Sequence, residues 1–180
     1  MGASITRVLA ECPLTKWSRR PGRCHWCDRM LVGRQQRWCS TLCNMAFRSQ
    51  HDWNTARDAA KRRDGNRCVR CGTGPHEVEL AFANVLAHLG VDPADVSVHV
   101  TYRQTDWYRR IVLDRSLEVN HIRPRGGRGY GMGCHHHLTG LETLCFRCHR
   151  EVTELQRAGI IVAGRDLNEL RSAGLLDPPS

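Results

Sequence analysis

Two short segments in the second half of this 180-residue chain carry side chain types that hydrolyse phosphodiester bonds in metal-dependent enzymes. In Leu117–Pro124, His121 closes a predicted strand. In Leu144–His149, the histidine at the end directly follows a Cys-x-x-Cys pair that opens a predicted helix. A positioned histidine can accept a proton from water, and a second can bind a divalent cation. The two segments flank a glycine-rich loop at 125–133 and indicate metal-assisted phosphodiester hydrolysis.

The first cysteine cluster consists of Cys24-x-x-Cys27 and, eleven residues later, Cys39-x-x-x-Cys43. A Cys-x-x-Cys turn supplies two thiolates at close range, and the second pair lies where a helix is predicted to begin. Four thiolates in a tetrahedron form a closed structural zinc site. Buried free thiols and disulfides are the alternatives. The compact paired spacing disfavours free thiols, and the expected compartment disfavours disulfides.

The second cluster is split along the chain, because Cys68-x-x-Cys71 precedes Cys145-x-x-Cys148 by more than seventy residues. Two such pairs often close one zinc site together, and we predict that they do so here. The zinc would clamp the strand that carries His121, so losing any of these cysteines should unfold the motif. A thiol redox role for the Cys-x-x-Cys pairs is a further alternative that the basic composition disfavours.

The remaining cysteines have no clear partner in the sequence. Cys12 stands apart from every other cysteine. The run Cys134–His137 permits two interpretations, a third metal site or a partly exposed tie within the loop. We favour the tie.

The chain is strongly basic, with 27 Lys and Arg against 18 Asp and Glu and a net charge of +9. The excess concentrates in residues 1–50 and 101–150, which also hold most of the cysteines. Basic surface on metal modules is typical of proteins that bind nucleic acid. We therefore predict DNA as a partner and these arginines as phosphate contacts: Arg57, Arg62, Arg63, Arg123, Arg125 and Arg128.

No apolar run reaches the length of a membrane span, and the N-terminus lacks the apolar stretch of a signal peptide. We expect a cytoplasmic protein without a membrane partner, in which cysteines serve as metal ligands rather than disulfides. Hydrophobic periodicity and turn residues predict these elements: a continuous basic helix at 41–63, a turn at 64–66, helices at 78–89, 147–158 and 166–173, and strands at 96–102 and 117–122.

The motif residues match a known pattern. Glu118–Pro124, the glycine-rich loop and Leu141–His149 resemble the HNH endonuclease family, whose pattern is an E-V-D-H-I-x-P strand, a loop, and N-L-x-T-L-C-x-x-C-H. Arg63–Gly72 also resembles the entry to such domains. The front cysteine cluster is similar to a small zinc module that precedes HNH domains in bacterial and phage proteins. The resemblance covers roughly residues 22–72 and 105–156.

This resemblance implies an α+β fold, a small zinc-stapled ββα-metal domain preceded by a treble-clef-like zinc module. It implies a general base at His121, and a catalytic Mg²⁺, Mn²⁺ or other divalent cation held by Asn120 and His149, with Glu118 as a further ligand. Two structural zinc ions are expected. The expected organisation is a flexible lead-in at 1–20, a zinc module at 21–48, a basic helix at 49–66, a nuclease domain at 67–158 with an insertion at 73–104, and a tail at 159–180.

Two positions depart from the family pattern. Asn120 stands where aspartate is usual, and it brings an oxygen without a charge, so metal affinity should fall; Glu118 on the same strand face is a possible compensation. Gly140 stands where the asparagine of the family name is expected. The sequence thus predicts a DNA endonuclease or nickase, in a bacterium or from a phage. The alternative is a non-catalytic zinc module that binds DNA or a partner. No feature indicates a homodimer.

Overall fold

The computed structural model describes residues 5–15, 21–92, 116–125 and 131–175. The strand predicted at 96–102 and Arg128 lie outside these residues. The chain divides into two compact units. The first contains residues 1–60 and 124–141, and the second contains residues 61–123 and 142–180. The chain therefore leaves the second unit after Arg123 and returns to it at Glu142.

The first unit is built around a small apolar core. Helix α1, Ile5–Glu11, packs its buried Val8 and Leu9 with Phe47 of helix α2, Thr41–His51. Partly buried Trp26, Trp38 and Met132 complete this core. The segment expected as a flexible lead-in at 1–20 thus contains a helix at Ile5–Glu11, which seven residues are too few to reveal by periodicity.

The helix predicted across 41–63 is interrupted. Helix α2 ends at His51 and helix α3, Trp53–Arg63, begins after Asp52, whose backbone is extended. The Asp52 carboxylate accepts hydrogen bonds from the backbone N–H and the hydroxyl of Thr55, at 3.1 and 2.9 Å. An aspartate in this position caps the following helix, since its oxygen satisfies a free N–H of the first turn. The basic helix is thus two helices joined at a cap.

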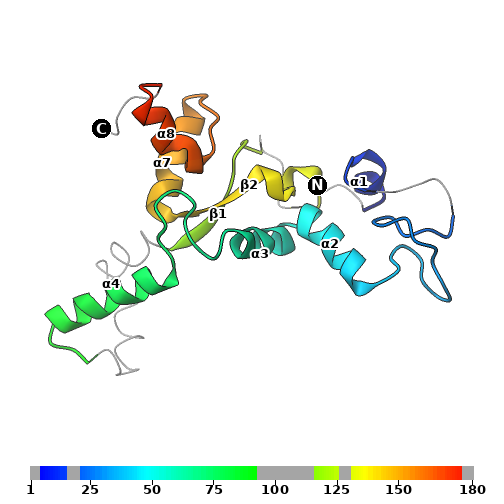
Figure 1. The fold of residues 1–180 in the computed structure, drawn as a ribbon, viewed down its shortest axis with the longest axis horizontal. Helices are drawn as coiled ribbons and strands as arrows, with labels where there is room; N and C mark the ends of the chain where they lie inside the picture. Colours follow the sequence, from blue (N-terminus) through cyan, green and yellow to red (C-terminus); the bar gives the residue numbers. More distant parts are fainter. Residues whose placement is uncertain (1–4, 16–20, 93–115, 126–130, 176–180) are drawn as a thin grey trace. The chain divides into compact units, whose positions relative to one another are not determined.

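The second unit holds a two-stranded sheet and four helices, counting the C-terminal part of α3, within the residues that the structure describes (Figure 1). Strand β1, Leu117–His121, pairs with strand β2, Leu141–Cys145, whose first residue falls at the boundary of the first unit. Helix α7, Phe146–Arg157, follows β2 directly. The other elements are helix α4, Pro75–His88, and helix α8, Leu167–Ser172. The fold is therefore α+β with a small sheet.

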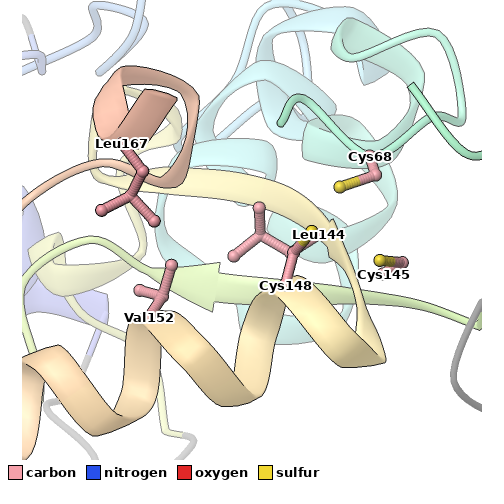
Figure 2. Packing of buried hydrophobic residues seen from close by; sticks show 6 residues of the cluster. All are labelled: Cys68, Leu144, Cys145, Cys148, Val152 and Leu167. Atoms are coloured by element: carbon pink, nitrogen blue, oxygen red, sulfur yellow. The ribbon is translucent and has the colours of Figure 1, made fainter. Parts of the chain in front are cut away.

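The core of the second unit lies between β2, α7 and α8. Figure 2 shows the side chains of Leu144, Val152 and Leu167 pointing toward one another, and all three are fully buried. The predictions of a strand at 117–122 and of helices at 78–89, 147–158 and 166–173 are confirmed by β1, α4, α7 and α8. Among the described residues, no helix is long and apolar enough to cross a membrane.

Candidate metal centres and catalytic residues

The first four-cysteine cluster lies in the first unit. The Sγ atoms of Cys27 and Cys39 are 3.5 Å apart, those of Cys39 and Cys43 are 3.6 Å apart, and all four lie within 4.8 Å of one another. Tetrahedral zinc with Zn–S bonds of about 2.3 Å separates its sulfurs by about 3.8 Å. The cluster formed by Cys24, Cys27, Cys39 and Cys43 therefore fits zinc.

Local backbone structure positions these four sulfurs. The first pair sits in a turn closed by hydrogen bonds from Cys24 N–H to Arg29 O and from Asp28 N–H to Cys24 O, at 2.8 and 2.9 Å. Cys43 lies in the first turn of α2, where its N–H donates to the Ser40 hydroxyl at 3.2 Å. Burial alone would raise the pKa of Cys24, but hydrogen bonds from the backbone around it lower that pKa to about 6. This lowered pKa favours the thiolate, the form that binds metal, at Cys24.

The split cluster lies in the second unit, where the structure brings Cys68, Cys71, Cys145 and Cys148 within 4.8 Å of one another. The prediction that these distant pairs meet is confirmed. The Sγ atoms of Cys71 and Cys145 are 3.7 Å apart, close to the sulfur–sulfur distance of a zinc tetrahedron. Of the four side chains only Cys71 is exposed. Figure 2 shows Cys68, Cys145 and Cys148 at the edge of the core of the second unit.

Two contacts fix the halves of the split cluster against each other. The backbone N–H of Val69 donates to Thr143 O at 2.9 Å, which ties the first cysteine turn to β2. Arg70 and Arg171 both contact the carboxylate of Glu151 on α7, with an Arg70 Nη2 to Oε1 distance of 3.0 Å. Burial alone would raise the pKa of Glu151, but these guanidinium groups lower it. The carboxylate therefore stays charged and binds both arginines.

A third cluster joins residues that the sequence does not pair. Cys12, His51, Cys134 and His137 place their donor atoms within 4.8 Å of one another in the first unit. Cys12 has no partner in its own segment, and the other three ligands are scattered over more than eighty residues. The run Cys134–His137, read as a loop tie, was the only available signal. Its two end residues, rather than the two middle histidines, belong to the cluster.

Glu118 and His149, two of the residues predicted to bind the catalytic cation, contact each other. Glu118 on β1 accepts a hydrogen bond from Nδ1 of His149, the residue after Cys148 in the first turn of α7. A carboxylate on Nδ1 holds the imidazole ring and directs Nε2 away from itself. This pairing is typical of histidines that bind metal through the other nitrogen.

Asn120 points elsewhere. Its Nδ2 donates to Oε1 of Glu142 on β2 at 2.9 Å, and the other carboxylate oxygen accepts from Gly164 N–H at 2.7 Å. Asn120 is 4% exposed and Glu142 is fully buried, so this hydrogen-bonded set is internal. Burial raises the pKa of Glu142 in spite of both donors. The amide suits this place, because an aspartate at position 120 would set two carboxylates side by side.

His121 ends β1 and is half-buried. Its backbone carbonyl accepts a hydrogen bond from Nε2 of Gln156 on α7 at 2.9 Å, and the carbonyl of Ile122 accepts from the same amide at 3.1 Å. This fixes the end of the strand. The groups of three or more metal-binding side chains found among the described residues do not include Glu118, His121 or His149. A single metal site shared by Asn120 and His149 stays a prediction.

The predicted phosphate contacts differ in their surroundings. Arg62 and Arg123 are exposed, and Arg125 is half-buried. Arg57 lies 3.6 Å from Asp58, and Arg63 forms two hydrogen bonds with Asp64 at 2.8 and 2.9 Å. Asp64 also accepts from the N–H of Thr143, so Arg63 neutralises a carboxylate that holds β2. Gly140 closes a 3₁₀ turn, Leu138–Gly140, and open space surrounds the place where a β-carbon would lie.

Comparison of the chain with protein-family models, with curated proteins and with solved structures gives no match.

Proposed function

We propose that this protein is a metal-dependent DNA endonuclease or nickase of the HNH type. The observation that carries the proposal is the Glu118–His149 pair, which joins β1 to the start of α7 beside the split cysteine cluster. The order of β1, β2 and α7 suits a ββα-metal domain, with a treble-clef-like zinc module ahead of it. A DNA substrate and reduced cysteines favour a cytoplasmic location.

The two four-cysteine clusters would each hold a structural zinc ion. Their sulfur–sulfur distances of 3.5 to 3.7 Å are within a few tenths of an ångström of the value that tetrahedral zinc requires. All four ligands in each are thiolates, which leaves zinc no open position for a reacting water. We therefore assign these ions to the fold rather than to the reaction.

The reaction itself would be carried by β1 and α7. His149 would bind a catalytic cation through Nε2, since Glu118 engages Nδ1. Asn120 retains its Oδ1 as an acceptor, because Glu142 occupies only the amide nitrogen. A bound Mg²⁺ or Mn²⁺ would stabilise the negative charge that develops on the scissile phosphate and on the leaving 3′ oxygen.

His121 would act as the general base. It would take a proton from water as the water oxygen attacks phosphorus. The side chain of Gln156 donates a hydrogen bond to the backbone carbonyl of His121, which restricts the position of the imidazole at the end of the strand. Arg62 and Arg123, exposed in the same unit, would contact the DNA phosphates.

A nicking assay on supercoiled plasmid tests this proposal. Zinc-loaded wild-type protein should convert supercoiled to open-circular DNA only when Mg²⁺ or Mn²⁺ is added. His149→Ala should be inactive at low cation concentration and partly recover at high concentration, because it removes a ligand and not the base. His88→Ala, at an exposed histidine of α4, is the matched control and should cut at the wild-type rate.

One observation favours a second function, a non-catalytic zinc module that binds DNA or a partner protein. The amide of Asn120 is buried and donates to Glu142, so this residue already serves the interior of the second unit. Under this alternative, the zinc-loaded protein shifts DNA in a binding assay but never nicks it with Mg²⁺ or Mn²⁺. That result would contradict the nuclease proposal and support the alternative.

A further inference from the structure

The third cluster draws its donors from three separate parts of the first unit. Cys12 follows the end of α1, and His51 is the last residue of α2. Cys134 begins a short 3₁₀ turn, and His137 follows it. Cys12 and His51 are buried, and the other two are half-buried. None of the four serves either four-cysteine cluster or the proposed catalytic residues. The cluster therefore needs an explanation of its own.

The distances between the ligand atoms suit one tetrahedral ion. Sγ of Cys12 lies 3.1 Å from Nε2 of His51 and 3.3 Å from Nε2 of His137, and the two Nε2 atoms are 3.2 Å apart. Zinc bonds of about 2.0 Å to nitrogen and about 2.3 Å to sulfur place neighbouring ligand atoms about 3.3 to 3.6 Å apart. The observed distances fall within about half an ångström of this range.

The ring of His51 is oriented as that of a metal ligand. Nδ1 of His51 lies 2.7 Å from the carbonyl oxygen of Phe47, which can only accept a hydrogen bond. Nδ1 must therefore carry the proton, and the lone pair of the neutral ring is on Nε2, the atom that faces Cys12 and His137. A backbone carbonyl on the second ring nitrogen is the usual partner of a histidine that binds zinc.

Backbone contacts also hold the segment around residues 131–140 against the end of α2 without help from a metal. Gly133 N–H donates to the carbonyl of His51 at 2.8 Å, and Leu138 N–H donates to the side-chain oxygen of Gln50 at 2.9 Å. These two bonds lie on either side of Cys134 and His137. These bonds thus place Cys134 and His137 beside the end of α2, where a single ion can bind them together with His51.

We propose that Cys12, His51, Cys134 and His137 bind a third structural zinc ion. The ion fastens α1 and the segment 131–140 to the end of α2. That segment is part of the connection between β1 and β2. Residues 124–141 of this connection belong to the first unit. The third zinc therefore anchors the connection between the two strands to the N-terminal module. The assignment does not depend on DNA cleavage.

Zinc content tests the proposal. Elemental analysis of purified wild-type protein should give three zinc ions per chain, where the two four-cysteine clusters alone would give two. Cys134→Ser and His137→Gln should each give two. His135→Gln, at a neighbouring histidine outside the cluster, is the control and should keep three. Two zinc ions in wild type, or the same content in wild type and Cys134→Ser, would overturn the proposal.

Cobalt titration gives a second readout that requires no variant. Apo protein should bind three equivalents of Co²⁺, one of them with d–d bands at shorter wavelength than the two S₄ sites, because imidazole gives a stronger ligand field than thiolate. Spectra of S₄ type only would contradict the assignment. So would a disulfide between Cys12 and Cys134, which thiol titration of denatured, chelated and unreduced protein would detect as two missing thiols.

Discussion

The two four-cysteine clusters use the same chemistry over very different lengths of chain. In the first cluster, Cys27 and Cys39 are 12 residues apart, and the site closes within one short segment. In the second, Cys71 and Cys145 are 74 residues apart. The first zinc would organise a turn and the start of α2, whereas the second would close a long loop and hold β2 and α7 in place. Two clusters with the same four ligands therefore stabilise very different amounts of structure.

The surroundings sharpen the contrast. In the first cluster only Cys24 is buried, whereas in the second only Cys71 is exposed. Cys145 and Cys148 also belong to the core that contains Leu144, Val152 and Leu167. Removing the second zinc would thus disturb a core to which two of its own ligands belong, whereas removing the first would release a segment whose Trp26 and Trp38 only border the core of the first unit.

Cysteine substitution should give the largest effect and would break the comparison if it failed. Structural zinc supplies about 10 kcal/mol or more of binding free energy, similar to the whole stability of a small domain. Cys68→Ser should lose one zinc ion and the cooperative unfolding transition of the second unit. Cys27→Ser should lose one zinc ion and keep that transition. Zinc analysis with amide exchange of Val69 and Phe146 distinguishes the two variants.

Equal exchange protection at these amides in Cys68→Ser and Cys27→Ser would show that the long-range cluster has no special structural role. Cys68→Ala serves as a second variant, because it removes the ligand without adding a hydroxyl to a buried position.

The Asn120–Glu142 pair tests whether the second unit also depends on long-range contacts that need no metal. Asn120→Asp should destabilise the protein by about 2 kcal/mol, because it removes a buried donor and sets a second carboxyl beside Glu142. Adding Glu142→Gln should recover much of this loss, since the glutamine amide can donate to the new aspartate. Denaturant unfolding of the single and double variants gives the coupling energy. Additive losses would refute the pairing.

The pH dependence has a definite sign. Burial raises the pKa of Glu142 in the folded state, so its contribution to stability is complete at acid pH and is lost as pH rises through that pKa. Asn120→Asp should raise the pKa further. Its deficit relative to wild type should therefore be small at acid pH and grow toward neutrality.

The smallest effect on stability is expected near the first cluster, at the start of α2. Ser40→Ala removes the hydroxyl that caps α2 through Cys43 N–H, and such a loss costs about 1 kcal/mol. The variant should bind zinc more weakly at the first cluster and leave exchange in the second unit unchanged. Amide exchange measured in both units decides this, and a change confined to the second unit would reverse the comparison.

The sequence predicts those features that have a recognisable spacing or periodicity. Spaced Cys-x-x-Cys turns indicated both four-cysteine clusters, and periodicity indicated β1 and α7. Strand β2 was not predicted, because Glu142 and Thr143 interrupt its apolar residues although every residue in it is buried. The break at Asp52 was missed because the helical pattern continues across it. The third cluster was missed because its ligands come singly from distant segments, and only tertiary structure brings them together.

We propose that the second unit cleaves DNA with His121 as the general base. The most direct test is the nicking rate of His121→Ala with Mg²⁺ or Mn²⁺, measured on protein whose zinc content equals that of wild type. General-base catalysis contributes about 10²- to 10⁴-fold, so nicking should fall by at least about 100-fold. Nicking by His121→Ala at the wild-type rate would contradict the assignment of His121 as the general base.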